Sequence, residues 1–386
     1  MMKSTIPLIF FLLFSFALKA IDSGEESATA KRIPWGGYWW PMQYGETALG
    51  WESNTGRVVW TEKEAIKFNK CLWSKTDACK KFINSSSSDH GRKLSPLMKY
   101  DLFVKRVIEK DPELAESGVD MQTFATQKEL DIHYIGNNTN HPLYENAGFA
   151  GKCIGWSLST FDYDEPTKEK IIMDIVFEPA DIKAILATFY SGSIFFISEK
   201  DFLGNQFLDI PGENSDKYYN DVLPHDFIKG LYKTIKKGKM LEGDLDPGHG
   251  VWNYPIYKYD LSWKNQKENW ISVQATIWFA DDEVEVDDVF STKNDRTDIK
   301  SRNYSFDLKM PANWNGKDLS LAVDGKWSGE SVDNHPDTLL LKLESDWREN
   351  IITIGTDDPS FNGWLATVNE SSGELFFDEL IYQYYK

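Results

Sequence analysis

Cysteine is scarce in this chain, and basic residues are outnumbered by acidic ones. The 386 residues include three cysteines, Cys71, Cys79 and Cys153, and none of them forms a CxxC pair. A structural zinc site therefore cannot be built here without histidine ligands. The chain has 42 Lys and Arg against 60 Asp and Glu, a net charge of −18. This balance argues against a general nucleic-acid-binding protein, which needs a basic surface to displace counterions.

Long hydrophobic runs are missing beyond the N-terminus. The apolar stretch at residues 6–18 follows the basic Lys3 and is short for a membrane span. Ala17 and Ala20 supply a small-residue end, in which Leu18 is an imperfect residue. We therefore predict a cleavable signal peptide over residues 1–20, secretion, and no transmembrane anchor after its removal. An uncleaved anchor is the alternative. The polar residues 21–33 are expected to form a loose tail.

Aromatic residues, in contrast, are plentiful, with 15 Trp, 17 Tyr and 23 Phe. They supply enough apolar surface to exclude general disorder. Helical periodicity marks residues 61–79, 94–116 and 178–190, whereas short strand patterns follow residue 251, at 256–259, 270–279, 304–308, 319–323 and 339–343. Helices precede strands and no linker or repeat divides residues 21–386. We predict one α+β domain, helical in its first half and antiparallel in its second.

Secretion changes how the cysteines are interpreted. Cys71 and Cys79 are eight residues apart, a spacing that a small disulfide loop can close in an oxidising compartment. Glycosylation is expected at surface sequons, which begin at Asn84, Asn137, Asn303 and Asn369. Cys153 is then unpaired, and the simplest interpretation is that it is a buried core residue.

The residues around Cys153 favour a nucleophile over a core cysteine. Gly148 and Gly151 precede it, Gly155 and Trp156 follow it, and a helix is expected to begin at the cysteine. A helix N-terminus favours the thiolate and presents N–H groups that can bind an oxyanion. We therefore predict a lowered pKa for the Cys153 thiol.

A thiolate nucleophile needs a base and a group that orients it. Of the six histidines, His225 is the predicted base because Asp244 and Asp246 follow it at 19 and 21 residues. His249 lies in an Asp-Pro-Gly-His-Gly turn and is the alternative. The order Cys153, His225, Asp244 is typical of a papain-like or transglutaminase-like triad.

The acidic run at residues 281–288 is the other prominent feature. In a strand, residues 281, 283, 285 and 287 would share one face. Clustered carboxylates can bind Ca²⁺, but such a run is more often a solvated face, and EF-hand spacing is absent.

Several segments resemble the transglutaminase elicitor family, secreted enzymes known from plant pathogens. They span residues 95–343, and Val251, Trp252, Asn253 and Pro255 carry the strongest agreement, with the family's elicitor peptide. The segments are SPLMKYD (95–101), GKCIGWS (151–157), PADIKAIL (179–186), DLDPGHGVWNYPI (244–256) and GKWSGESVDNHPDTL (325–339). The elicitor-like segment departs at Tyr254, Tyr257 and Lys258, and the chain has no cysteine beyond 153.

The resemblance implies a protein-glutamine γ-glutamyltransferase with a papain- or transglutaminase-like catalytic core. Cys153 would be the nucleophile, His225 the base and Asp244 the acid, with glutamine-containing proteins and primary amines as substrates. No cofactor is needed for the chemistry, while some calcium dependence is implied. Two alternatives remain open: a papain-like cysteine peptidase or amidase, and a catalytically silent recognition protein in which Cys153 is buried or disulfide-bonded.

Overall fold

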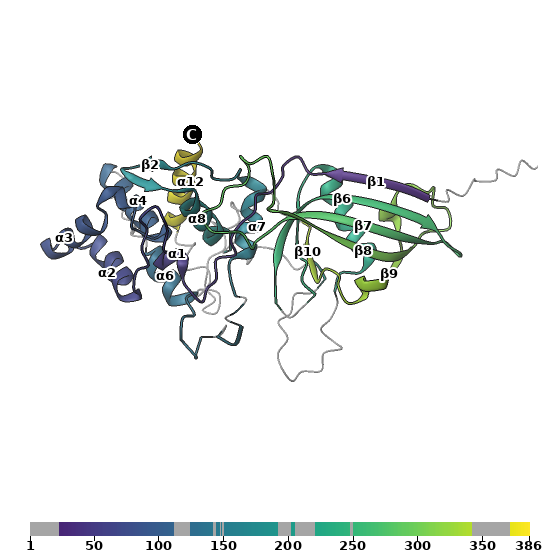
Figure 1. The fold of residues 1–386 in the computed structure, drawn as a ribbon, viewed down its shortest axis with the longest axis horizontal. Coiled ribbons are helices and arrows are strands. Elements are labelled where there is room, and N and C mark those ends of the chain that lie inside the picture. Colours follow the sequence, from purple (N-terminus) through teal and green to yellow (C-terminus); the bar gives the residue numbers. More distant parts are fainter. Residues whose placement is uncertain are drawn as a thin grey trace, which may run out of the picture.

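A computed structural model describes residues 23–111, 124–141, 144–146, 148, 150–191, 202–204, 221–247, 250–341 and 371–386. The predicted signal peptide lies outside these residues. Figure 1 shows a helical half and a sheet half that meet at helix α7, so the predicted α+β arrangement is confirmed.

The helical half is built from the first part of the chain and is completed by the C-terminal helix. Its elements are α1 (Glu46–Leu49), α2 (Glu62–Leu72), α3 (Asp77–Ser86), η1 (Asp89–Gly91), α4 (Pro96–Lys110), α6 (Ala125–Ile132), η2 (Tyr144–Asn146), α7 (Cys153–Asp162), β2 (Lys170–Ile172), β3 (Ile175–Phe177), α8 (Pro179–Ser191) and α12 (Ser371–Tyr385). Helix α8 confirms the pattern at 178–190, with Pro179 at its first position, where a proline costs no hydrogen bond.

The sheet half is antiparallel. Its elements are β1 (Ser23–Thr29), β4 (Phe202–Gly204), α9 (Pro224–Lys233), η6 (Ile235–Lys237), β5 (Leu241–Asp244), β6 (Asn253–Asn265), β7 (Trp270–Ala280), β8 (Ile299–Lys309), η7 (Leu319–Leu321), β9 (Asp324–Trp327), η8 (Gly329–Val332) and β10 (Thr338–Leu340). Within the described residues the strand order is β4-β10-β5-β6-β7-β8-β9, and β1 also pairs with β6.

The predicted N-terminal tail is wrong, because residues 23–29 form strand β1. This strand pairs with residues 258–264 of β6, while β5 pairs with residues 253–256. Because β7 occupies the other edge of β6, β1 and β5 lie end to end along the same edge. Glu26 anchors β1: its carboxylate accepts hydrogen bonds from the Tyr232 and Tyr259 hydroxyls and pairs with Lys236.

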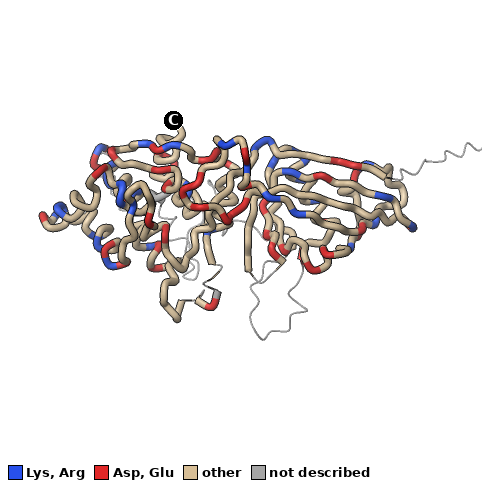
Figure 2. The backbone as a smooth tube through the Cα atoms, in the orientation of Figure 1, with Lys and Arg blue, Asp and Glu red and all other residues tan. Residues whose placement is uncertain are grey.

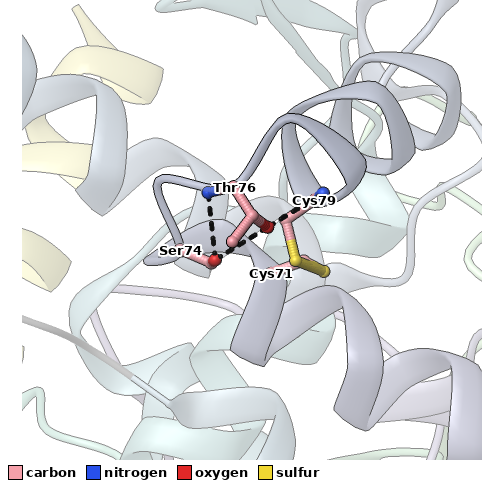
Figure 3. The surroundings of a disulfide bond; sticks show 4 residues. All are labelled: Cys71, Ser74, Thr76 and Cys79. Carbon is pink, nitrogen blue, oxygen red and sulfur yellow. Dashed lines mark hydrogen bonds between the residues drawn. A yellow bond between two sulfur atoms is a disulfide. The ribbon is translucent and has the colours of Figure 1, made fainter.

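The pattern at residues 61–79 contains two helices, joined by the predicted disulfide. Thr61 caps α2 through a capping box with Glu64, and Thr76 caps α3. Ser74 and Thr76 hydrogen-bond in the intervening turn, and the Cys71–Cys79 disulfide closes it (Figure 3). The disulfide prediction is therefore confirmed, but the single helix is not, because the side chains of the turn satisfy the backbone in its place.

The strand predicted at residues 319–323 is wrong. Residues 319–321 form the 3₁₀ helix η7, where the Asp318 carboxylate accepts from the Ser320 N–H at 3.0 Å. The acidic run at 281–288 is a turn-rich segment whose strand-like pairing is an isolated bridge between Tyr38 and Glu283. The predicted strands at 256–259, 270–279 and 304–308 fall within β6, β7 and β8. The one predicted at 339–343 overlaps β10 at residues 339–340, and residues 342–343 lie outside the described residues.

Each half has its own hydrophobic core. The helical core includes Phe68, Phe103, Trp156 and Leu186, and the sheet core packs α9 against the sheet, with Phe227 resting on Tyr304 and Phe306.

A buried ion network joins α4 and α8 inside the helical core. Asp181 pairs with Arg57 at 2.5 Å and with Lys99 at 2.6 Å, and all three side chains are fully enclosed. Arg57 also pairs with Glu178 at 2.6 Å. Since an enclosed charge is costly unless it is matched, each member of this network depends on the others.

Surface features agree with parts of the sequence interpretation. Lys and Arg are interspersed with Asp and Glu along both halves (Figure 2). Asn84, Asn137 and Asn303 are exposed, whereas the sequon at Asn369 falls outside the described residues. Among the described helices, none combines the length and apolar character needed to cross a bilayer.

Candidate active site

Cys153 is the first residue of α7, as the sequence predicts. The preceding residue, Lys152, donates its backbone N–H to the Trp39 carbonyl at 2.6 Å, which fixes where the helix begins. The Lys152 ammonium is buried and pairs with Glu129 at 2.9 Å, and Glu129 also accepts from His133 at 2.8 Å. The start of α7 is therefore attached to α6 by a buried cluster of charged groups.

The glycines around Cys153 serve close packing. A Cβ atom on Gly151 would lie 2.6 Å from the Trp39 carbonyl oxygen, and one on Gly155 would lie 2.0 Å from the Ala187 carbonyl oxygen. Both distances are too short for any other residue. Gly155 thus allows α7 to approach α8 closely.

The Cys153 thiol is enclosed. Its side chain is 5% exposed; Sγ donates to the Val251 carbonyl oxygen at 3.7 Å and accepts from the Asn253 amide nitrogen at 3.6 Å. Burial raises the pKa of the thiol to about 12, with Asp282 and Asp244 adding to the rise and Asn253 opposing it. The predicted lowered pKa is therefore wrong, because desolvation outweighs the helix terminus.

Asp244 lies beside this thiol. It ends β5 directly opposite Asn253 of β6, and its Oδ1 accepts from the backbone N–H groups of Trp252 at 3.0 Å and Asp246 at 3.2 Å. Burial, followed by the charge of Asp337, raises the pKa of Asp244 to about 8 despite these hydrogen bonds. Asp244 thus holds the turn that leads to Val251 and Asn253, and it acts electrostatically on Cys153.

His225 is placed elsewhere. It is the second residue of α9, which packs on β8 and β9, and its backbone lies against Gly325. Its Nε2 is 3.7 Å from Asp226, while its Nδ1 is buried without a hydrogen-bond partner among the described residues. In the part of the chain that the structure describes, no recorded interaction links His225 to Cys153 or Asp244. The structure brings Cys153 and Asp244 together but does not bring His225 to them.

The alternative base, His249, lies outside the described residues. His133 belongs to the buried cluster of Lys152 and Glu129 at the start of α7, and its Nδ1 is hydrogen-bonded to Glu129. Burial is the largest cause that lowers the pKa of His133, and the Lys152 charge adds to it.

Sequence reasoning missed three residues beside the thiol: Asn253, Tyr254 and Asp282. Asn253 and Tyr254 begin β6, and Asp282 follows β7. Asp282 is fully buried, and burial raises its pKa to about 7, with the charges of Asp281 and Glu283 contributing. The acidic run drew attention to position 282. Its burial could not be predicted, because the other five acidic residues of the run have the same kind of side chain and are not buried.

The implied calcium does not fit the acidic run. Asp281 pairs with Lys300 at 3.3 Å, Asp288 lies 3.5 Å from Lys293, and Asp282 points into the interior. Across the described residues, no group of three or more acidic, histidine or cysteine side chains is arranged to hold a metal ion.

The structure is similar to the crystal structure of the GP42 transglutaminase from Phytophthora sojae. The TM-score is 0.47 and the sequence identity is 16%, over 81% of this chain and 82% of the other. An identity of 16% establishes no shared activity. No family model and no curated protein matches the sequence.

Proposed function

We propose that this chain is a protein-glutamine γ-glutamyltransferase that works through a thioester on Cys153. The observation that supports it most is the surroundings of the thiol. Cys153 begins a helix, Asn253 donates to its sulfur, and two buried carboxylates act on it electrostatically. A core cysteine needs none of these groups, and perturbed carboxylates beside a potential nucleophile are typical of functional sites.

In the proposed reaction, the Cys153 sulfur attacks the side-chain amide of a protein glutamine. The thiol proton leaves with ammonia and a thioester forms. A primary amine then attacks the thioester carbonyl, the C–S bond breaks, and an isopeptide or substituted amide is released. Backbone N–H groups in the first turn of α7 have no intrahelical partner and would stabilise the oxyanion.

The acid role of Asp244 has structural support, whereas the base role of His225 is assigned from the sequence alone. Asp244 is the proposed acid, supported by its hydrogen bonds to the Trp252 and Asp246 N–H groups, which hold the turn beside the thiol. The base role of His225 comes from the order of residues in the sequence and has no contact to support it.

A catalytically silent recognition protein is the second candidate, and the burial of Cys153 favours it. A thiol that is 5% exposed with a raised pKa is what that candidate predicts. For the enzyme, the same burial means that the site must open before a glutamine can reach the sulfur. Both candidate functions imply a secreted protein. The disulfide and the exposed sequon asparagines support secretion.

The experiment is incorporation of a fluorescent alkylamine into a glutamine-containing protein, with the modified glutamines identified by mass spectrometry. Wild-type protein should transfer the amine, Cys153→Ala should be inactive while folded, and Cys153→Ser should be nearly as inactive. A folded Cys153→Ala protein with full activity would disprove the proposal. Hydrolysis of peptide bonds without amine transfer would favour the peptidase, and absence of both activities would favour the silent protein.

The base is tested separately with histidine variants. His225→Gln and His249→Gln are compared with His90→Gln, a control at an exposed histidine that pairs with Asp174 at 2.6 Å. Loss of activity in His225→Gln supports the predicted base. Loss in His249→Gln alone transfers the role to His249.

A further inference from the structure

Asp282 carries a buried charge that its surroundings do not satisfy. The residue is 0% exposed, and within the described structure neither carboxylate oxygen makes a hydrogen bond of standard geometry. The nearby Tyr254 hydroxyl and the backbone of Asp282 itself lower its pKa, but burial outweighs both. Enclosing a carboxylate without partners costs several kcal/mol. A group of this kind calls for a specific explanation, such as a catalytic role or a ligand.

The backbone holds Asp282 in place beside the thiol. Gly37 donates its N–H to the Asp281 carbonyl at 2.9 Å and accepts from the Val284 N–H at 3.4 Å, so the segment on either side of Asp282 is fixed. From this position the carboxylate raises the pKa of both the Cys153 thiol and the Tyr254 hydroxyl. Gly37 also lies against α7, because a Cβ on Gly37 would be 2.0 Å from the indole nitrogen of Trp156, three residues after Cys153. The unsatisfied carboxylate and the proposed nucleophile therefore belong to one enclosed site.

We propose that Asp282 is the residue that binds the ammonium group of the amine substrate and removes its proton. This inference depends on the proposed function, which it deepens by assigning the residue that recognises the amine and the charged form in which the amine binds. The acceptor is a primary alkylammonium, such as a lysine side chain or a polyamine. An ammonium group provides the hydrogen bonds and the positive charge that Asp282 lacks.

Proton transfers balance over the two half-reactions. In acylation, the Cys153 S–H proton moves to the departing nitrogen and releases ammonia, and protonated Asp282 donates its proton to form ammonium. The carboxylate is then charged. In deacylation, the alkylammonium gives one proton to Asp282, the neutral amine attacks the thioester carbon, and its surplus N–H proton returns to the Cys153 sulfur as the C–S bond breaks. One glutamine amide and one alkylammonium become one substituted amide and one ammonium.

The surroundings of Asp282 suit this cycle. Its pKa of about 7 lets it hold or release a proton near neutral pH. The charged neighbours with the largest effects on its pKa, Asp281 and Glu283, are both negative and favour a cation. Enclosure also excludes water, which would otherwise compete with the amine for the thioester.

The test compares two amine acceptors on three proteins. Cadaverine carries ammonium groups at neutral pH, whereas hydroxylamine is uncharged. Asp282→Asn keeps the shape of the side chain and removes its charge. Asp288→Asn is the matched control, because it removes a charge of the same acidic run that lies 3.5 Å from Lys293 at the surface. Rates with both acceptors are measured at pH 7.5 for wild type and both variants, after each is shown to be folded by circular dichroism.

We expect Asp282→Asn to lose about 10- to 100-fold in kcat/KM for cadaverine, the effect of one charged hydrogen bond, while hydroxylamine transfer stays within about twofold or rises. Asp288→Asn should change both by less than about twofold. Unchanged cadaverine transfer in Asp282→Asn, or equal losses with both acceptors, overturns the assignment.

A second measurement separates failure of this inference from failure of the proposed function. Butylammonium should slow iodoacetamide labelling of Cys153 in wild type but not in Asp282→Asn. Protection without any transfer activity supports ammonium binding and refutes the transferase. Transfer without protection refutes ammonium binding at Asp282 and leaves the transferase intact.

Discussion

Replacing Asp282 with asparagine should stabilise the fold at pH 8 and not at pH 4. Burial raises the pKa of Asp282 from 3.8 to about 7. Three units correspond to about 4 kcal/mol of preference for the protonated form in the folded state. An asparagine amide at the same position is also unpaired and costs about 1–2 kcal/mol. We therefore expect Asp282→Asn to raise the free energy of unfolding at pH 8 by about 2–3 kcal/mol.

The sign follows from proton linkage. Below pH 4 the carboxyl group is protonated in both the folded and the unfolded chain, so its ionisation imposes no penalty. Between pH 4 and pH 7 the unfolded chain loses its proton first, and the fold is destabilised progressively as pH rises. Above pH 7 the full penalty is present. The advantage of Asp282→Asn should therefore grow across this window and become constant above it.

Urea unfolding at pH 4, 5.5, 7 and 8 measures this advantage, with Asp288→Asn as the control. The control removes a partly exposed ion pair with Lys293 and should lose less than about 1 kcal/mol at pH 8. Equal stability of wild type and Asp282→Asn at every pH, or a less stable variant at pH 8, would refute the burial of an unpaired carboxylate at this position. The expected result, a more stable but less active variant, is typical of a residue retained for function.

Three further outcomes are expected. Replacing both Cys71 and Cys79 with serine should lower the free energy of unfolding by at most about 3 kcal/mol in urea, since the disulfide closes a short loop; a larger loss would show that the bridge does more than restrict the unfolded chain. Iodoacetamide should label native Cys153 more slowly at pH 7.5 than it labels the unfolded chain, and the rate should rise toward pH 12, because burial raises the pKa of the thiol; mass spectrometry that finds rapid native labelling would contradict the enclosed site. Asp181→Asn should cost about 3–5 kcal/mol in thermal unfolding, because it leaves Arg57 and Lys99 buried without their shared carboxylate; a loss under 1 kcal/mol would contradict the network.

The sequence predicts the fold class and the start of α7 because both depend on local signals. Pro179 and the apolar spacing that follows it mark α8, and Cys153 does begin its helix. Strand β1 could not be predicted, because residues 23–29 contain no alternating apolar side chains. Its stability comes from backbone pairing with β6 and from Glu26, whose three partners lie more than 200 residues away. Such contacts leave no periodic pattern in the sequence.

The candidate site also has features that the sequence could predict and features that it could not. Asp244 reaches Cys153 through the pairing of β5 with β6, so its proximity follows from two adjacent strands. Asp282 is far from both in sequence, and its approach depends on the pairing of Gly37 with residues 281 and 284. The sequence also could not predict that the pKa of Cys153 is raised. Enclosure of the thiol beside Val251 and Asn253 outweighs the effect of the helix N-terminus, which favours the thiolate. Residue order alone suggested His225, and order does not determine which face of a sheet a helix covers.

Strand β1 has a consequence for how the chain can be shortened. With β1 in place, residues 258–264 of β6 have hydrogen-bonding neighbours on both sides. A recombinant chain that began at Ile33 would leave seven residues of β6 with free N–H and C=O groups along one edge and would remove the partner of the Tyr259 and Tyr232 hydroxyls. Bare edges of this kind pair with other chains. The N-terminal segment therefore acts as a guard against self-association, and trimming it as a dispensable leader should produce oligomers or aggregates rather than a smaller monomer.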